Sequence, residues 1–385
     1  IFDVYNCPDE EVTTVWVDID EEVEVDFSYG VGDLCTITDD VWVSPDGDDN
    51  NLGTSENQAF LTIERALEMI APENDNPITI NLTEGIFSPS TTGEEFPIVM
   101  ISNVNLIGQG EEVTIIDAEG DEENERSVIR IENCNNNIIN NLTLSGGFLG
   151  GSSGGNSHPF YGGGIFIMNS NGLLLSDLNI RNNHARKGGG IYIYESSPTI
   201  ESVHIFDNVA VSGAGIACSA AYPIINGSYP LILNSIISNN RYEQWGGGIY
   251  CKENSNPIIE NVIISDNYSE SLALPSGGGM FITGRAAITL NFVEITGNTA
   301  FHGGGIYFHA YSGFEESIFN NTTISHNEAT GYNGCGGGVY SNGNGRSLIL
   351  KNVLIIENNS NYDGGGLYIN QGNNVNLENV RFYNN

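Results

Sequence analysis

Basic residues and long apolar runs are what this chain of 385 residues has least of. Lysine and arginine together number 12 against 49 aspartate and glutamate residues, which gives a formal net charge of −37 at pH 7. A charge of that sign repels nucleic acids and anionic membranes, so we expect no nucleic-acid partner. No apolar run approaches the ~20 residues that a helix needs to cross a bilayer, so we also expect no membrane insertion.

The negative charge is concentrated in the first third of the chain. Residues 1–125 carry 32 of the acidic residues and a single basic one, Arg65, whereas residues 126–385 carry 17 acidic and 11 basic residues. An acidic block suits an extracellular or cell-surface location, where cations screen the carboxylates, although solubility alone also explains it. The chain begins at Ile1 and stops within a repeat, so we expect a processed chain or a fragment that continues beyond residue 385.

Glycine is abundant, with 48 residues, and much of it recurs in one signature. The signature is a glycine triplet, or Gly-Ala-Gly in one copy, followed by an aliphatic residue and usually an aromatic one. No repeat has the pattern of an amphipathic helix, which disfavours leucine-rich and helical solenoids. The eight copies lie 25 to 33 residues apart, at 162–166, 188–192, 213–217, 246–250, 277–281, 303–307, 336–340 and 364–368.

Each repeat also has an aliphatic residue three positions before an asparagine. Alternating apolar and polar residues around both signatures predict two or three short strands per repeat. One coil per repeat, with each strand stacked in parallel on its copy, satisfies the backbone and builds a continuous core. We therefore predict an all-β fold, a right-handed parallel β-helix with regular coils over residues 128–385. Its stacked asparagines form a structural ladder of Asn183, Asn208, Asn240, Asn267, Asn298, Asn327 and Asn358.

Alternation along a strand also predicts which side chains face outward. The aliphatic residue after each glycine triplet points into the core, so the next residue lies on the outer face. Exposed rings in such a row serve either as a platform for sugars or as a packing surface. The outward row contains Phe166, Tyr192, Tyr250, Phe281, Tyr307, Tyr340 and Tyr368.

The first third of the chain is organised differently. Residues 1–40 alternate between acidic and apolar positions, which predicts acidic β-strands that end a preceding domain or form an N-terminal extension. A short helix over residues 57–70, with Ser55 as its N-cap, would cover the open end of the solenoid. Residues 41–385 then form one β-helix domain. The apolar face of the helix consists of Phe60, Ile63, Leu67 and Ile70.

Two stretches resemble known families. The segment VWVSPDGDDNNLGTSENQAFLTIERAL at residues 41–67 resembles the opening of bacterial right-handed β-helix proteins of the pectate-lyase-like superfamily. The glycine and asparagine repeats resemble those of chlamydial polymorphic outer-membrane proteins. The resemblance covers residues 41–385 and implies the fold. The superfamily includes polysaccharide lyases, hydrolases, adhesins and passenger domains, so it does not select an activity.

One acidic loop has the composition of a calcium site. Asp46, Asp48, Asp49 and Asn50 supply hard oxygen atoms around Gly47, which suits a compact loop for Ca²⁺, the one cofactor we expect. A solvated acidic loop without metal is the alternative.

Six cysteines are present, without the C-x-x-C pattern of a zinc site. Cys218 and Cys251 hold the same place in successive repeats. Stacked strands lie ~4.8 Å apart, so we expect the two side chains to touch, as a disulfide or as two buried thiols. Cys7 and Cys35 are candidates for a second disulfide between the N-terminal strands.

A single dense basic patch offers catalytic chemistry. Arg181, Arg186 and Lys187 lie together in the sequence, and a lyase that acts on acidic sugars needs a basic residue of this kind. A solvated turn explains the same residues.

Two functions follow from these features. The first is a non-enzymatic extracellular or cell-surface protein, an adhesin, stalk, filament subunit or passenger domain, whose partners are carbohydrate, other surface proteins or further copies of itself. The second is a calcium-dependent polysaccharide lyase or a glycoside hydrolase that acts on an acidic polysaccharide. Regular repeats and scarce basic residues favour the first, and an enzyme, in that case a polysaccharide lyase, is the less favoured alternative.

Overall fold

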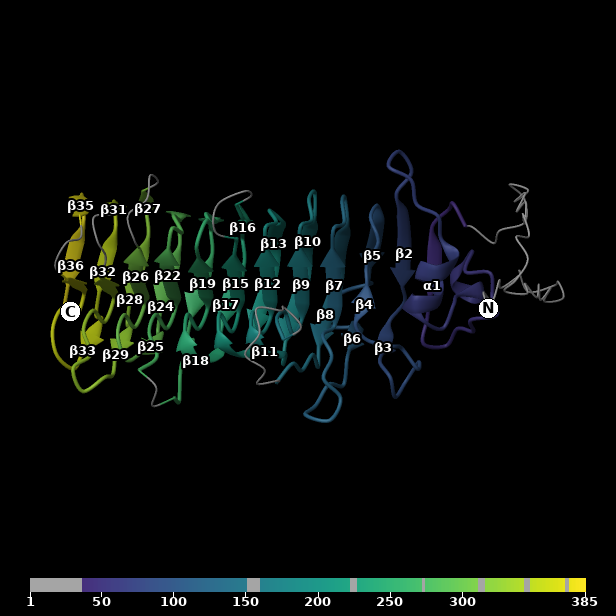
Figure 1. Ribbon diagram of the computed structural model, residues 1–385, viewed down its shortest axis with the longest axis horizontal. Helices are drawn as coiled ribbons and strands as arrows, with labels where there is room; N and C mark the ends of the chain where they lie inside the picture. Colours follow the sequence, from purple (N-terminus) through teal and green to yellow (C-terminus); the bar gives the residue numbers. More distant parts are fainter. Residues whose placement is uncertain are drawn as a thin grey trace, which may run out of the picture.

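The computed structural model describes residues 37–150, 160–221, 227–271, 274–310, 316–342, 347–370 and 374–385. These residues form an all-β solenoid whose coils stack along one axis, from α1 at one end to β36 at the other (Figure 1). The described strand pairs are parallel, as in Val41–Ile80 and Ile191–Ile216. The predicted parallel β-helix is therefore confirmed. No helix in the described ranges is long and apolar enough to span a membrane.

Two long sheets run the length of the solenoid. The ten-stranded sheet, which indicates about ten turns, contains the strands that follow the glycine triplets. Its strands are β4 (Ile98–Val99), β7 (Ile129–Glu132), β9 (Ile165–Met168), β12 (Ile191–Tyr194), β15 (Ile216–Ser219), β19 (Ile249–Lys252), β22 (Met280–Gly284), β26 (Ile306–Ala310), β30 (Val339–Ser341) and β34 (Leu367–Ile369).

The twenty-stranded sheet contains the strands that precede the asparagines. They are β1 (Val41–Val43), β2 (Ile78–Leu82), β3 (Gly85–Phe87), β5 (Val104–Ile107), β6 (Thr114–Asp117), β8 (Ile138–Ser145), β10 (Leu174–Arg181), β13 (Thr199–Phe206), β16 (Leu231–Leu233), β17 (Ile236–Ser238), β20 (Ile258–Glu260), β21 (Ile263–Ser265), β23 (Thr289–Asn291), β24 (Glu294–Thr296), β27 (Ser317–Asn320), β28 (Thr323–Ser325), β31 (Ser347–Lys351), β32 (Leu354–Ile356), β35 (Asn374–Glu378) and β36 (Arg381–Tyr383).

Two three-stranded sheets connect the long ones. The first contains β11 (His184–Lys187), β14 (Val209–Ser212) and β18 (Arg241–Trp245), and the second contains β25 (Thr299–Ala300), β29 (Glu328–Ala329) and β33 (Asn359–Ser360). Inside the coils, aliphatic side chains from equivalent positions lie over one another. Ile191 pairs in register with Ile165 and Ile216, and all three side chains are fully buried. Full burial of such a side chain contributes about 1.5–3 kcal/mol, so a one-residue slip is strongly disfavoured.

The glycine triplets allow coils to approach closely at one corner. Gly188 has a left-handed backbone with φ of 63°, which favours glycine. A Cβ atom on Gly190 would lie 2.7 Å from the carbonyl oxygen of Gly215 in the next coil. A larger residue would therefore force neighbouring coils apart at this corner.

The asparagines form a buried hydrogen-bonded ladder. Asn267 Oδ1 accepts hydrogen bonds from the backbone N–H of Asn240 at 3.0 Å and from its Nδ2 at 2.9 Å. Asn267 Nδ2 donates to Asn298 Oδ1 at 2.9 Å and to the carbonyl oxygen of Ile237 at 3.1 Å. Each amide thus joins two neighbouring coils, and Asn267 is fully buried. The residue before each asparagine turns the corner in the left-handed region, as Asp266 does with φ of 54°.

The ladder predicts a large loss of stability in Asn267→Ala. The substitution leaves the Ile237 carbonyl, the Asn240 backbone N–H and Asn298 Oδ1 buried without these partners, and we expect it to cost about 3 kcal/mol. Urea denaturation followed by circular dichroism measures the loss. Asn376→Ala is the matched control, because the Asn376 side chain is exposed and donates a hydrogen bond to Glu378 at 3.2 Å within its own strand. Equal losses in both variants would contradict the role of the ladder.

The predicted helix over residues 57–70 is wrong in its bounds. Helix α1 spans Ile63–Met69, and Glu56–Gln58 form a separate 3₁₀ turn, η1. Ser55 makes no side-chain capping bond; instead, Thr62 Oγ1 accepts a hydrogen bond from the N–H of Arg65 at 3.1 Å. The helix starts late because the Asp49 carboxylate holds Leu61 and Thr62 in an extended approach.

Helix α1 lies at the N-terminal end of the described coils (Figure 1). Ile63 and Ala66 are buried in the core, whereas Phe60 reaches the core from a bridge to Val43 outside the helix. The role of α1 as a cap stays a prediction. The acidic strands predicted within residues 1–40 fall almost entirely on residues 1–36, which lie outside the described ranges.

A buried carboxylate also holds the first turn of α1. Glu94 is 1% exposed, and its Oε2 and Oε1 accept hydrogen bonds from the N–H groups of Ile63 at 2.8 Å and Glu64 at 3.0 Å. Burial, together with repulsion from Glu64 and Asp49, raises the pKa of Glu94 to about 7 despite those two bonds. The folded state therefore binds a proton that the unfolded chain releases near pH 4.5.

This titration predicts that stability falls as pH rises. The contribution of protonated Glu94 is fully present below about pH 4.5 and is lost as pH rises through 7. We expect wild type to lose roughly 3 kcal/mol more than Glu94→Gln between pH 4.5 and pH 8, measured by urea denaturation. Glu95→Gln, at the exposed neighbouring position, should follow wild type. Parallel curves for wild type and Glu94→Gln would rule out Glu94 as the titrating group.

Candidate functional site

Aromatic rings form a row on the outer face of the ten-stranded sheet, which Ala217 interrupts between Tyr192 and Tyr250. They follow the inward aliphatic residues by one position and pair in register, as Phe281 does with Tyr307 and Tyr307 with Tyr340. Ring centroids lie 4.9 Å apart in the first pair and 4.7 Å apart in the second, with nearly parallel planes. The spacing follows directly from the ~4.8 Å distance between parallel strands.

The expectation that these rings are exposed is wrong for most of them. Phe166, Tyr192, Tyr250, Phe281 and Tyr340 are each at most 8% exposed. Each ring covers the face of its neighbour, and side chains from flanking rows cover the edges. The row is therefore the floor of a groove rather than a free platform.

Two rows of side chains flank this floor. On one side stand the residues directly before the glycine triplets, where Trp245 pairs with Ser276 and Ser276 with His302. On the other side Lys252 pairs with Thr283, and Thr283 with His309. The first row is contributed by the corner of the coil and the second by the ends of the strands.

The floor and the flanking rows enclose a groove of about 460 Å³. Trp245 is 40% exposed at its edge, and its ring centroid lies 6.3 Å from that of Tyr250 and 6.1 Å from that of Phe281. An apolar floor with a few polar groups at its margin is typical of ligand sites. The groove is lined by Trp245, Tyr250, Lys252, Glu253, Ser276, Phe281, Thr283, Tyr307 and His309.

Positive charge gathers beside the groove. The Nζ of Lys187 lies 4.9 Å from the ring centroid of Tyr161, in cation–π contact. Burial, together with the positive charges of Lys252 and Arg186, lowers the pKa of Lys187 to about 8. Burial also lowers the pKa of His309 on the opposite flank.

The three predicted basic residues do not form one cluster. Arg186 and Lys187 lie on β11, next to the ten-stranded sheet, whereas Arg181 ends β10 on the twenty-stranded sheet. The structure instead brings Lys187 near Lys252, 65 residues later in the chain. Lys252, Trp245 and His309 were not identified from the sequence. Counting each position from its own glycine triplet would have aligned Lys187 with Trp245 in one row.

In the acidic loop predicted to bind calcium, several carboxylate oxygen atoms accept hydrogen bonds from the protein itself. Asp48 Oδ1 accepts hydrogen bonds from the N–H of Asn50 at 2.9 Å and from its Nδ2 at 2.8 Å, which lowers the pKa of Asp48. Asp49 accepts from the backbone of Leu61 and Thr62. Across the described ranges, no three His, Cys, Asp or Glu side chains converge as metal ligands. Calcium binding by Asp46 and its neighbours stays a prediction.

Cys218 and Cys251 lie side by side in the core. They pair in register between β15 and β19, both are fully buried, and both are free thiols rather than a disulfide. A hydrogen bond with Cys218, together with burial, raises the pKa of the Cys251 thiol. Cys7 and Cys35, the other disulfide candidates, lie outside the described residues.

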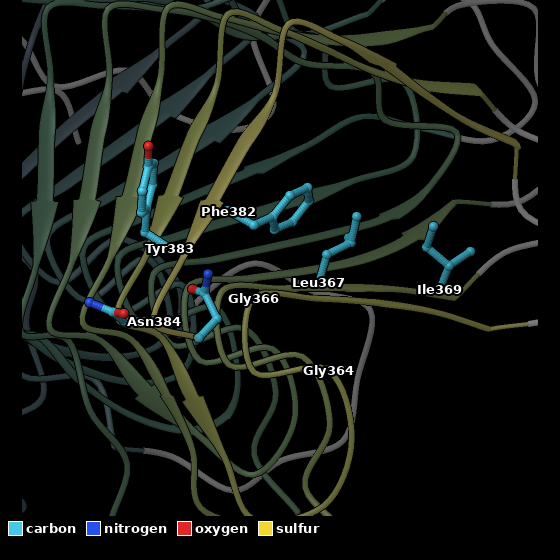
Figure 2. A pocket seen from close by; sticks show the side chains of 8 residues that line it. Gly364, Gly366, Leu367, Ile369, Phe382, Tyr383 and Asn384 are labelled. Atoms are coloured by element: carbon cyan, nitrogen blue, oxygen red, sulfur yellow. The ribbon is translucent and has the colours of Figure 1, made fainter.

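A second hollow lies at the last described coil (Figure 2). It measures about 550 Å³ and is lined by β34, β36 and the ladder end, with Phe382 46% and Tyr383 53% exposed. β36 pairs with β32 on one side, and no described strand pairs with its other side. The hollow is the end face of the coil stack, so we do not treat it as a binding groove.

Residues 45–280 match the family described as protein of unknown function, DUF1565. The chain belongs to this family. No curated protein matches the chain in sequence. In structure, the chain is similar to pectate lyase Pel9A, with a TM-score of 0.54 and 12% identity over 90% of this chain and 79% of that one. This similarity shows the fold alone.

Two further structures resemble the chain more weakly. A rhamnogalacturonan lyase has a TM-score of 0.45 and 11% identity, over 89% of this chain and 87% of that one. Pectin methylesterase PemA from Erwinia chrysanthemi has a TM-score of 0.42 and 13% identity, over 87% of this chain and 92% of that one.

Proposed function

We propose that this DUF1565 protein is an extracellular or cell-surface β-helix that binds polysaccharide along the groove of the ten-stranded sheet. The observation that carries the proposal is the exposed Trp245 ring above a floor of stacked rings, within a groove of about 460 Å³. The exposed part of the Trp245 ring offers an apolar surface to a sugar ring, and Lys252, Glu253 and Thr283 can hydrogen-bond the hydroxyl groups at the margin. A surface role as an adhesin, stalk, filament subunit or passenger domain accords with this binding.

Glycan binding is supported by the direction of the groove as well as by its composition. The aromatic floor runs from coil to coil along the solenoid axis, as the paired rows of Tyr250, Phe281 and Tyr307 show. A polymer of repeating sugar units can contact several coils at once, whereas a small compact ligand cannot. Other surface proteins and further copies of the chain are the alternative partners.

The proposal predicts that Trp245→Ala weakens polysaccharide binding about tenfold, because the variant loses the large exposed ring at the groove edge. Affinity electrophoresis through gels that contain soluble plant, algal or bacterial polysaccharides identifies a ligand, and calorimetry then gives the affinity. Tyr332→Ala is the control, since Tyr332 is 83% exposed and lies outside the groove. Retention of no polysaccharide by the wild-type chain would refute the proposal.

A polysaccharide lyase is the second candidate, favoured by one observation. The pKa of Lys187 is lowered to about 8, so a substantial fraction of this amine is neutral at weakly alkaline pH and can act as a base. A lyase removes the proton beside the carboxylate of a uronic-acid residue and leaves an unsaturated sugar. Calcium dependence and glycoside hydrolysis belong to the same alternative.

The lyase alternative predicts unsaturated products from uronic-acid polymers, detected by ultraviolet absorbance, with and without added calcium. We expect the wild-type chain to release none, consistent with a binding protein. Product formation that disappears in Lys187→Ala and persists in Arg181→Ala would establish the lyase instead. Arg181 is the control because it lies on the other long sheet.

A further inference from the structure

Lys187 is a partly buried cation whose electrostatic neighbours are also cations. Its Nζ lies over the Tyr161 ring, and it forms no ion pair with any carboxylate in the described part of the chain. Lys252 and Arg186 are the charged groups that act on it, and both repel its ammonium group.

This arrangement is unusual in a chain with a net charge of −37. Two further basic residues out of the 12, Lys252 and Arg186, lie close enough to lower the pKa of Lys187. Lys252 itself has an acidic neighbour, Glu253, at 4.0 Å. A cation that is partly removed from water loses hydration free energy unless an anion or hydrogen-bond acceptor replaces the water. No carboxylate in the described ranges replaces the lost hydration of Lys187, so the carboxylate or sulfate of a ligand would fit beside it.

The register places Lys187 in the same flanking row as Trp245, beyond the residues that line the groove. Lys187 pairs with Ser212, and Ser212 pairs with Trp245, so Lys187 stands two coils from Trp245 in the same flanking row, about 10 Å away along the axis. Lys252 lines the groove from the opposite flank. The two lysines therefore stand on either side of the aromatic floor, which includes Tyr192 and Tyr250.

We propose that Lys187 and Lys252 form an anion subsite that binds carboxylate or sulfate groups of a glycan lying along the aromatic floor. The proposal rests on the polysaccharide-binding function and specifies its ligand as an anionic glycan. Each ammonium group offers donors for charge-assisted hydrogen bonds, and the neighbouring rings orient the sugar. In this role Lys187 is protonated, which differs from the neutral base that a lyase would need.

Matched pairs of ligands test the subsite by calorimetry at pH 7. One pair is a galacturonic-acid hexamer and its full methyl ester, which differ in charge but not in backbone. The other is a sulfated galactan oligosaccharide and its desulfated form. We expect wild type to bind at least one anionic member about tenfold more tightly than its neutral partner, a difference that added salt reduces.

Lysine variants assign that difference to the subsite. Lys187→Met retains the packing of the aliphatic stem, and with Lys252→Gln it should lose most of the preference, whereas Lys187→Arg should retain it. Lys351→Gln is the control, because Lys351 pairs with Glu378 on the other long sheet. Circular dichroism and urea midpoints identify any variant that misfolds. If Lys187→Met misfolds, Lys187→Arg still tests the subsite, because it keeps the positive charge and should keep the preference for the anionic ligand.

The outcomes separate this inference from the function on which it rests. Binding of anionic and neutral members with equal affinity would overturn the anion subsite and leave polysaccharide binding in place. An anionic preference that survives in both Lys187→Met and Lys252→Gln would also overturn it. Binding of neither pair, nor of any polysaccharide in the gels, would remove both proposals together.

Discussion

The structure depends on hydrogen bonds that each coil makes to the next, most completely along the buried asparagine row. The amide of Asn267 joins the coils before and after it through backbone and side-chain bonds. Because these groups lie away from water, any change of register would leave several of them unsatisfied at once. The ladder thus holds the coils at one spacing, and every other row of side chains follows the same spacing.

Features outside the core follow from this constraint. The coil spacing brings rings at equivalent positions to stacking distance. The ring centroids of Tyr340 and Tyr368, for example, lie 5.1 Å apart. The same register aligns Trp245 with Ser276 and Lys252 with Thr283 on either side of the rings. The groove is therefore a direct product of coil stacking, and its chemistry is set by which residues occupy the flanking positions.

The periodic features could be predicted from the sequence, because each repeat contains a glycine triplet and an asparagine at positions that fix how it aligns with the next repeat. The glycine triplets and the asparagines were sufficient to predict parallel coils, inward aliphatic rows and the adjacency of Cys218 and Cys251. The bounds of α1 could not be predicted, since Asp49 and Glu94 capture backbone amides from outside the helix. Local propensity contains no information about such distant acceptors.

The candidate site was predicted only in part for a related reason. Lys187 was identified, but its approach to Lys252 depends on repeats of unequal length, and its contact with the Tyr161 ring is a contact between coils. The burial of the aromatic row likewise arises from contacts between coils, which a residue-by-residue alternation does not describe.

A crystal structure of the chain with a bound oligosaccharide tests the central claim most directly. The account predicts sugar rings that follow the solenoid axis above Tyr250, Phe281 and Tyr307, with one ring against Trp245. Sugar density that crosses the coils, or that lies on the twenty-stranded sheet instead, would contradict it.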